Sequence, residues 1–332
     1  MAAQPEPLLA CIVVTYNGAP WLPQCLNSIQ QSTVSARIIV VDNASQDETV
    51  AIVRSRNGVE LIETGTNLGF GRANNIGIAR ALDLGAEHVL ILNQDAHLAT
   101  DALELLLKVS ATNLAIGILC PMQLDAEGRA TDPTFLRYYL AVYASALLDD
   151  ALLGRSLKSQ YTVAAAPAAA WLLTSRFLRE VGGFDPLFFM YCEDDDLCSR
   201  ASHHGYQVAV VPAALFYHDR GFHSQVKSET RSRKIRRKTS RLRSSLVRDI
   251  KQPSGKFWKN AWHALSERVL LGLTALLSHL DWIEACAAVM AVLRVLLFEL
   301  PAISRHRRQC LEKGPHWLPG SPHPRSSVLK EY

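Results

Sequence analysis

Carboxylate and amide side chains stand directly after three short apolar runs in the first hundred residues. The runs cover residues 8–14, 37–41 and 88–92, and the polar residues after them include Thr15, Asn17, Asp42, Asn43, Asn93 and Asp95. In open α/β sheets, ligands bind outside the carboxyl ends of the strands. Asp42 or Asp95 alone is equally well explained as a helix cap. Three successive strand ends that each carry an acid or an amide favour a binding site at one edge of a sheet.

Four consecutive acids, Glu193 to Asp196, follow the aromatic run Phe188-Phe189-Met190-Tyr191. Acids at the start of a helix are favoured by the helix dipole, which is the purely structural explanation. An apolar wall beside them, however, raises the pKa of a carboxyl group toward values that suit a general base. We expect Leu197 to point into the core and Arg200 to pair with Asp196, four residues before it.

His218 follows a strand predicted at residues 206–211 and is a candidate metal ligand near these acids. A lone histidine is more often an ordinary one, but Asp95 supplies an oxygen ligand in the same predicted site. Mg²⁺ or Mn²⁺ on a diphosphate needs few protein ligands, because phosphate oxygens and water complete its coordination.

The glycine-rich segment 65–75 suits close contact with a ribose or a phosphate, although a plain loop before a helix is the alternative. Asn74 stands where a dinucleotide-binding fingerprint needs its third glycine, and the first strand–helix turn lacks that motif. A nicotinamide-dependent oxidoreductase is therefore disfavoured.

The elements that must position these residues follow from the apolar pattern. The three runs are short and do not alternate, as expected for strands buried on both faces of a parallel sheet. Helices are predicted at residues 21–31, 74–84 and 101–110, a capping box at 45–48 predicts one more, and a later strand is predicted to end at 171–173. Alternating strands and helices indicate an α/β fold.

The overall composition conceals an uneven distribution of charge. The chain has 332 residues, 48% of them hydrophobic, and a net charge of +4, which excludes a disordered chain. Nine basic residues and one acidic residue between positions 227 and 243 give that segment a net charge of +8. It contains no aromatic residue, so nucleic-acid binding is disfavoured. Beside the apolar segments 269–280 and 285–298, it predicts attachment to an anionic membrane surface, with a soluble helical subdomain or a dimer interface as the alternative.

Targeting signals and cysteines favour a reducing compartment. No basic residue precedes the run 8–14, so a signal peptide is not expected, and neither C-terminal apolar segment reaches the ~18 residues of a spanning helix. The seven cysteines form no Cys-x-x-Cys pair, which predicts neither a disulfide framework nor a zinc site. We expect a cytoplasmic protein, peripheral on the inner face of the cell membrane.

Six motifs occur in order between residues 8 and 224. They are Thr15-Tyr16-Asn17, Val41-Asp42-Asn43-x-Ser45-x-Asp47, Asn67-x-Gly69-Phe70-x-x-Ala73-x-Asn75-x-Gly77, Leu92-Asn93-Gln94-Asp95, Gly182-Gly183-Phe184-Asp185 and Phe188-Phe189-x-Tyr191-x-Glu193-Asp194-x-Asp196-Leu197-x-x-Arg200. The ordered set resembles glycosyltransferase family 2, within it the bacterial rhamnosyltransferase-like branch. The resemblance implies a GT-A nucleotide-diphospho-sugar transferase fold, with a Rossmann-like, mostly parallel sheet, and inverting transfer from a nucleotide sugar.

The resemblance also implies roles for individual residues. Those implied to bind the nucleotide sugar are Thr15, Asn17, Asp42, Asn43, Asn67, Arg72, Asn93 and Trp171. Asp95 would hold a divalent cation, Mg²⁺ or Mn²⁺, with His218 as a second ligand. Asp194 would deprotonate the acceptor hydroxyl, Glu193 would orient the acceptor, and Phe189 would form an apolar wall. Asn93 replaces an acid found in many relatives, and Gln94 replaces the commoner proline, so the expected metal site has one carboxylate instead of two.

The expected organisation is a catalytic domain at 8–224, a basic linker at 225–260, a helical region at 261–310 that contacts a membrane or a partner, and a disordered tail at 311–332. The expected reaction transfers a sugar, rhamnose by the branch resemblance, from a dTDP- or UDP-sugar to a cell-envelope or polysaccharide glycan, including a lipid-linked one. A nucleotidyltransferase, or a nucleic-acid-binding protein that uses the basic segment, is the alternative. The nucleotidyltransferase is disfavoured because residues 15–20 contain no basic residue to bind phosphate.

Overall fold

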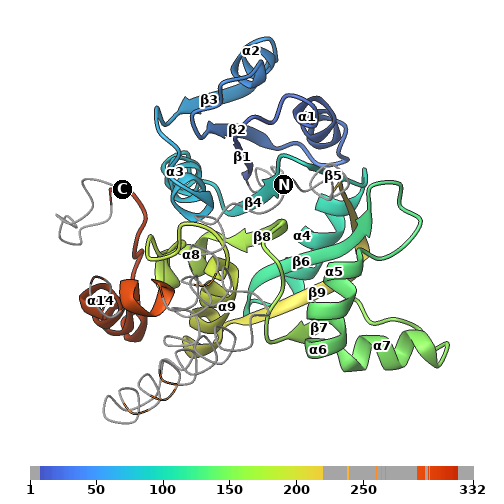
Figure 1. The fold of residues 1–332 in the computed structure, drawn as a ribbon. Coiled ribbons are helices and arrows are strands. Elements are labelled where there is room, and N and C mark those ends of the chain that lie inside the picture. The colour runs from blue at the N-terminus through green and yellow to red at the C-terminus, as the bar shows by residue number, and fades with distance from the viewer. Residues whose placement is uncertain are drawn as a thin grey trace, which may run out of the picture.

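The computed structural model describes residues 8–219, 290–295 and 300–320, and residues 238, 259, 263, 266 and 298 singly. The strands of this part are β1 (Leu9–Thr15), β2 (Arg37–Asp42), β3 (Val59–Glu63), β4 (His88–Asn93), β5 (Ala96–Leu98), β6 (Ile116–Asp125), β7 (Tyr161–Val163), β8 (Ala170–Thr174) and β9 (Gln207–His218). They form one sheet in the order β3-β2-β1-β4-β8-β6-β9-β5, with β7 paired to β9 (Figure 1).

The sheet is parallel along β3, β2, β1 and β4, and β6 is parallel to β9, whereas β8 runs antiparallel to both of its neighbours. The helices are α1 (Leu22–Gln30), α2 (Thr49–Arg54), α3 (Phe70–Asp83), α4 (Ala102–Thr112), α5 (Pro133–Phe135), η1 (Leu136–Leu140), α6 (Ala141–Tyr143), α7 (Ser145–Leu152), α8 (Ser175–Val181), α9 (Glu193–His203) and α14 (Leu300–Leu311). The predicted α/β architecture is confirmed, including the strands at the three apolar runs.

Both faces of the sheet are buried under helices, which explains why the strands do not alternate in polarity. On β1, Cys11 belongs to one hydrophobic cluster and Ile12 to the cluster on the opposite face. Leu26 of α1 packs in the first cluster, and Ile78 of α3 and Leu197 of α9 pack in the second. The prediction that Leu197 points into the core is confirmed, and α9 is thereby fixed with its acids at the start of the helix.

Residues 300–320 pack onto the helical face formed by α8 and α9 (Figure 1). The Gly314 N–H donates to the carbonyl of Glu180 at 2.9 Å, and the Gly183 N–H donates to the carbonyl of His316 at 3.0 Å. Leu318 is buried in the core cluster of α3 and α9. The expectation of a disordered tail is therefore wrong for residues 311–320, and residues 321–332 lie outside the described part of the chain.

The predicted basic segment lies outside the described residues except for single positions, as do the apolar segment 269–280 and much of 285–298. Within the residues that the structure describes, no helix is both long enough and apolar enough to cross a membrane.

Candidate functional site

The ends of β1, β2 and β4 are joined by hydrogen bonds at one edge of the sheet. The Thr15 hydroxyl donates to Gln94 Oε1 at 2.7 Å, and the Asn43 N–H donates to the Thr15 carbonyl at 2.7 Å. The sequence prediction that three strand ends bring polar groups together is confirmed by these contacts. Gln94, noted in the sequence only for replacing a proline, is the residue that connects β4 to β1.

Asp42 has a buried oxygen that none of the described residues satisfies. Its Oδ2 accepts the Ser45 N–H at 3.0 Å, whereas Oδ1 is buried and has no hydrogen-bond partner. Buried polar atoms normally have a partner, so an unsatisfied acceptor at a strand end calls for an explanation. A ligand that donates a hydrogen bond would supply one.

The loop after β1 contacts the loop after β2. The Asn17 N–H donates to Ser45 Oγ at 2.9 Å, and Asn17 Oδ1 accepts the Gln46 N–H at 2.8 Å. The predicted capping box is wrong: Glu48 is the N-cap of α2 and no side chain caps it, because Ser45 is engaged by Asn17. The two loops therefore form one unit beside Asp42.

The glycine-rich segment packs against the aromatic loop before α9. Asn43 Nδ2 donates to Asn67 Oδ1 at 3.2 Å, and Asn43 Oδ1 accepts the Leu68 N–H at 2.7 Å. A Cβ on Gly69, whose φ is +82°, would lie 2.2 Å from the Phe189 carbonyl oxygen. The Phe70 N–H donates to that oxygen at 3.1 Å. Asn43 and Asn67 thus shape this loop, and Gly69 permits its contact with the acidic end of the site.

The structure corrects the expectation for Trp171. Its side chain is fully buried in β8, where it stacks on Phe184 with ring centroids 6.2 Å apart. A side chain with no exposed surface does not line a sugar site, so Trp171 is a core residue. Arg72, in contrast, is partly exposed at the start of α3; burial lowers the pKa of its guanidinium, and Asp185 opposes that effect.

Asp95 and His218 are brought together although they are 123 residues apart. His218 Nε2 lies 3.1 Å from Asp95 Oδ1, and His218 Nδ1 lies 2.7 Å from the side-chain amide of Gln123. The antiparallel pairing of β5 with β9 places Ala96 opposite His218 and so makes this contact. Asn93 ends β4, and its N–H donates to the carbonyl of Ala169 at 2.9 Å.

The acidic cluster begins α9 after two residues in the left-handed region, Tyr191 at φ +73° and Cys192 at φ +70°. Such a backbone is costly for residues other than glycine and persists where surrounding contacts hold it. Glu193 is buried, and its Oε2 has no hydrogen-bond partner. Burial, reinforced by the neighbouring charge of Asp194, raises the pKa of Glu193 well above its ordinary value. Its burial and the adjacent charge therefore both favour the neutral form of the Glu193 carboxyl group.

Asp194 has the electrostatic properties of a general base. Burial and the charge of Asp195 raise its pKa to about 6. The Tyr139 hydroxyl of η1 donates to Asp194 Oδ2 at 3.3 Å, and the Asp195 N–H donates to Oδ1 at 2.9 Å. At pH 7 such a group is mostly ionised and still basic enough to take a proton. The direction of this pKa shift is the one expected from the sequence, and its causes are burial and the charge of Asp195.

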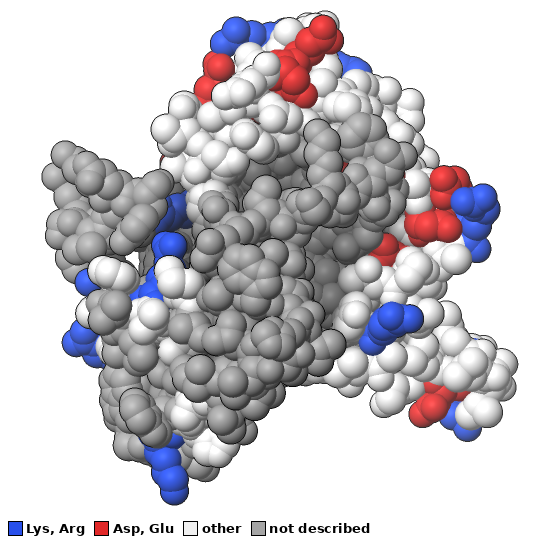
Figure 2. Space-filling model, in the orientation of Figure 1, with Lys and Arg blue, Asp and Glu red and all other residues white. Residues whose placement is uncertain are grey.

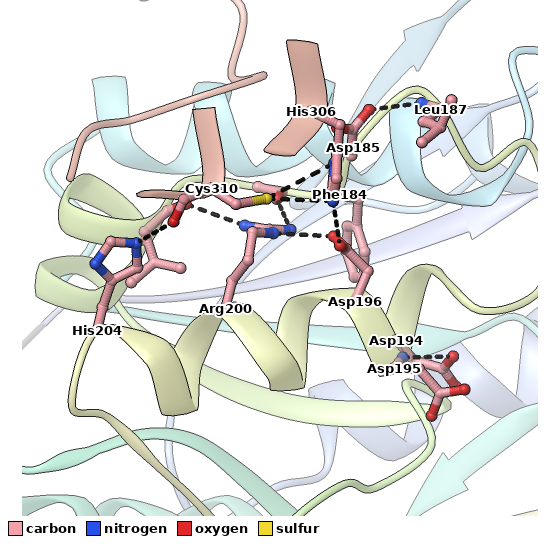
Figure 3. A network of polar contacts seen from close by, with 12 residues as sticks. Phe184, Asp185, Leu187, Asp194, Asp195, Asp196, Arg200, His204, His306 and Cys310 are labelled. Atoms are coloured by element: carbon pink, nitrogen blue, oxygen red, sulfur yellow. Dashed lines mark hydrogen bonds and ion pairs between the residues drawn. The ribbon is translucent and has the colours of Figure 1, made fainter. Parts of the chain in front are cut away.

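Asp196 faces away from Asp194 into a buried network (Figure 3). Its Oδ2 accepts from Arg200 Nε at 2.9 Å, which confirms the predicted pair, and its Oδ1 lies 3.1 Å from His306 Nε2. Although burial raises the pKa of Asp196, the charges of Arg200 and His306 lower it to about 2. His306 and its other partner, Asp185, were not identified from sequence, because no local spacing connects α14 to this loop.

Asp196, His306 and Cys310 are also close enough to suggest a metal site, since one ligand atom from each lies within 4.8 Å of the others. The Arg200 guanidinium occupies one Asp196 oxygen, and burial raises the pKa of Cys310 and keeps its thiol protonated. The negative charges of Asp185 and Asp196 are balanced by the positive charges of Arg200 and His306. We assign this cluster to structure and not to metal binding.

Comparisons with known sequences place these motifs in one family. Residues 10–146 match the glycosyl transferase family 2 profile, and residues 88–300, more than half of the chain, match that of glycosyl transferase family group 2. The chain belongs to glycosyl transferase family 2. This glycosyltransferase therefore contains the reactive groups above within a domain that transfers sugars, and the nucleotidyltransferase alternative is set aside.

Similar proteins include several rhamnosyltransferases. The glycosyltransferase is 27% identical over 232 residues to N-acetylglucosaminyl-diphospho-decaprenol L-rhamnosyltransferase of Mycobacterium tuberculosis, covering 64% of this chain and 76% of that protein. It is 29% identical over 230 residues to rhamnosyltransferase WbbL of Escherichia coli, covering 64% of this chain and 86% of that protein.

Solved structures share the fold at low sequence identity. The mannosyltransferase PcManGT of Pyrobaculum calidifontis, in complex with GDP-Man and Mn²⁺, has a TM-score of 0.56 at 19% identity, covering 88% of this chain and 87% of that one. Residues 1–349 of Staphylococcus aureus TarS give a TM-score of 0.53 at 15% identity, covering 92% and 88%. These likenesses establish the GT-A fold of the glycosyltransferase.

Proposed function

We propose that this glycosyltransferase moves L-rhamnose from a dTDP- or UDP-sugar to a hydroxyl of a cell-envelope or polysaccharide glycan, with inversion at the sugar carbon. The observation that carries the proposal is Asp194, a partly exposed carboxylate with a raised pKa in the first turn of α9. The loop before this helix contacts the glycine-rich segment through the Phe189 carbonyl. Inverting transfer needs one base and no covalent nucleophile, and Asp194 is the residue that we assign as this base. The named rhamnosyltransferases among its relatives support rhamnose.

The donor is proposed to bind at the ends of β1 and β2. Asp42 Oδ1 is the acceptor that lacks a partner, and a ring N–H or a ribose hydroxyl of the nucleoside would satisfy it. Thr15 and Asn17 lie beside Asp42 through the contacts described above. Arg72 is the basic side chain proposed to bind the diphosphate. Asn67 and Asn43 hold the loop that precedes α3, the helix that contains Arg72.

Asp95 and His218 are proposed to hold a divalent cation on the diphosphate. Their facing oxygen and nitrogen are 3.1 Å apart. A carboxylate oxygen and an imidazole nitrogen are both possible ligands of Mg²⁺ or Mn²⁺, so Asp95 and His218 would hold the ion together if it bound here. The bound cation would offset charge on the departing diphosphate. The protein contributes one carboxylate, because Asn93 and Gln94 flank Asp95, and the donor must supply most of the coordination.

At the acceptor, Asp194 is proposed to accept the proton of the attacking hydroxyl. Glu193, buried and with one oxygen that has no partner among the described residues, is proposed to hold the acceptor by a hydrogen bond. Phe189 lies on the loop between donor and acceptor groups, so its ring is proposed as the apolar wall beside the sugar.

A panel of nucleotide sugars tested by thermal unfolding, with and without Mn²⁺, examines the donor proposal. We expect dTDP- or UDP-sugars to raise Tm, more so with Mn²⁺, because a ligand that binds only the folded state stabilises it. The variant Asp95→Ala should lose the Mn²⁺-dependent part of the shift, whereas the control Asp83→Ala, an exposed acid on α3, should retain it. Absence of any shift across the panel would contradict the proposal.

The acceptor is proposed to be lipid-linked, and the enzyme to work at an anionic membrane surface on the cytoplasmic side. The Mycobacterium relative is named for a decaprenol-linked substrate. Segment 136–153, which includes the Asp194 partner Tyr139, also exposes the apolar side chains of Leu136, Tyr138, Val142, Leu152 and Leu153. The lobe that contains α7, at the lower right of Figure 2, is mostly white, so few of its visible residues are charged. The basic segment 227–243 would add electrostatic attraction.

Sedimentation with liposomes tests this membrane proposal. We expect the protein to pellet with anionic vesicles at low salt, to pellet less at high salt because salt screens the basic segment, and to stay in solution with zwitterionic vesicles. The double variant Leu152→Asp, Leu153→Asp should weaken the pelleting that persists at high salt. Protein that remains in the supernatant with anionic vesicles at low salt contradicts the proposal.

A further inference from the structure

The loop that delivers the acids to the site has both of its ends in contact with one buried side chain from α14. What we call the loop 185–196 comprises the loop before α9, from Asp185 to Cys192, and the first turn of α9, from Glu193 to Asp196. His306 lies between its ends: Nδ1 forms a short hydrogen bond with Asp185 Oδ2, and Nε2 lies 3.1 Å from Asp196 Oδ1 (Figure 3). The His306 side chain is 1% exposed.

A neutral imidazole has one N–H donor, whereas both ring nitrogens of His306 face a carboxylate oxygen. Only the protonated ring donates to Asp185 and Asp196 together. Burial alone would lower the pKa of His306, but the charges of Asp196 and Asp185 raise it well above its ordinary value. The other titratable or charged groups that face this cluster are Arg200 from α9 and Cys310 from α14. His306 is therefore an imidazolium that bridges the two ends of the loop.

Asp185 and Asp196, the two residues that His306 joins, are each connected to the segment that contains Glu193 and Asp194. Asp185 Oδ1 accepts the Leu187 N–H at 2.6 Å, and the Asp185 carbonyl accepts the Phe188 N–H at 3.1 Å, which fixes the turn into the aromatic segment. Asp196 lies in the first turn of α9, the same turn that carries Glu193 and Asp194. Between these ends the backbone passes through the left-handed conformations of Tyr191 and Cys192, which need fixed ends to persist.

We propose that His306 is a positioning residue for catalysis: by joining Asp185 to Asp196 it fixes the loop 185–196 and thereby the orientation of Glu193 and Asp194 toward the acceptor. This inference rests on the proposed function, since it takes Asp194 as the base. His306 does not touch the acceptor, so its effect falls on the rate of the chemical step and not on donor binding.

Kinetics of His306→Gln against a matched variant at the same helix interface test the inference. Glutamine donates to one carboxylate only and carries no charge. We expect kcat for transfer to fall ten- to a hundredfold, with KM for the donor changed less than twofold. The control is His204→Ala: His204 Nε2 lies 2.9 Å from the Cys310 carbonyl, so this change loosens the contact between α9 and α14 without altering the loop. It should lower Tm and leave kcat within twofold.

Rescue provides the second readout. In His306→Ala, added imidazole should occupy the vacated space and restore part of kcat, which a general loss of stability would not allow. If His306→Gln does not fold, Asp185→Asn weakens the same bridge with the side-chain shape preserved, and the same loss of kcat is expected. Unchanged kcat in the folded variants, or an equal loss in His204→Ala, overturns the inference. A wild-type protein that transfers no sugar would instead overturn the proposed function.

Discussion

Replacing Asp194 by asparagine is expected to lower kcat for sugar transfer by about 10²- to 10⁴-fold, the range typical for loss of a general base. The amide preserves the shape of the side chain and its contact with Tyr139 but cannot accept the acceptor proton. Donor affinity should change little, because the proposed donor groups lie at the strand ends. Transfer kinetics and donor titration measure the two effects separately.

The pH dependence of the wild-type enzyme should report the same carboxyl group. Asp194 must be ionised to act as a base, and its pKa is raised to about 6, so kcat/KM should fall as the pH decreases through about 6. Asp195→Asn is the matched control: Asp195 is exposed, and its charge helps to raise the pKa of Asp194. This variant should retain transfer, with the acid limb displaced to lower pH. Loss of transfer in Asp195→Asn but not in Asp194→Asn would contradict the assignment.

Arg200→Met is expected to destabilise the fold by about 3–5 kcal/mol, the cost of leaving one partner of a buried ion pair uncompensated. Arg200 is fully buried and donates to Asp196, to the Val181 carbonyl at 3.0 Å and to the Gly183 carbonyl at 2.7 Å. Its guanidinium also lies 4.5 Å from the centre of the Trp317 ring. Methionine fills similar space but donates no hydrogen bond to any of these acceptors.

Urea unfolding of Arg200→Met and of Arg176→Met measures this cost against a control. Arg176 pairs with Glu180 at the same helical spacing, but its side chain is 66% exposed. Exposed pairs contribute about 0–1 kcal/mol, so the control should lose no more than that. Equal losses in the two variants would show that burial of the Arg200 network contributes nothing to stability.

Much of the sheet was predictable because burial on both faces leaves uninterrupted apolar runs, as in β1, β2 and β4. β3 was missed since it lies at the edge of the sheet, where Glu60 and Glu63 interrupt the apolar pattern. β6 was missed because it contains Pro121, next to which its pairing with β9 shifts register. These strands depend on their neighbours more than on a local pattern.

Some residues of the candidate site could also be predicted from the sequence, and others could not. Residues at strand ends and at the start of α9 were identified because sequence order determines which sheet edge they reach. Trp171 was placed wrongly, since the pattern of a buried strand does not distinguish a core ring from one that lines a site. His306 was missed because it lies 121 residues from Asp185, and only tertiary packing brings the two together.

The contact of residues 312–318 with α3 also has a consequence for synthesis of the chain. Asn75 donates to the carbonyl of Trp317, 242 residues later. The last strand of the sheet, β9, ends at His218, so the chain that forms the sheet is made well before Trp317. At about 5–20 residues per second, a ribosome needs roughly 5–20 s to pass from one to the other. During this time the sheet can form while the Asp196–Arg200 ion pair of α9 still lacks the His306 imidazolium and the Trp317 indole beside it. The nascent enzyme therefore acquires a fixed acceptor loop only after translation has passed its last described residues.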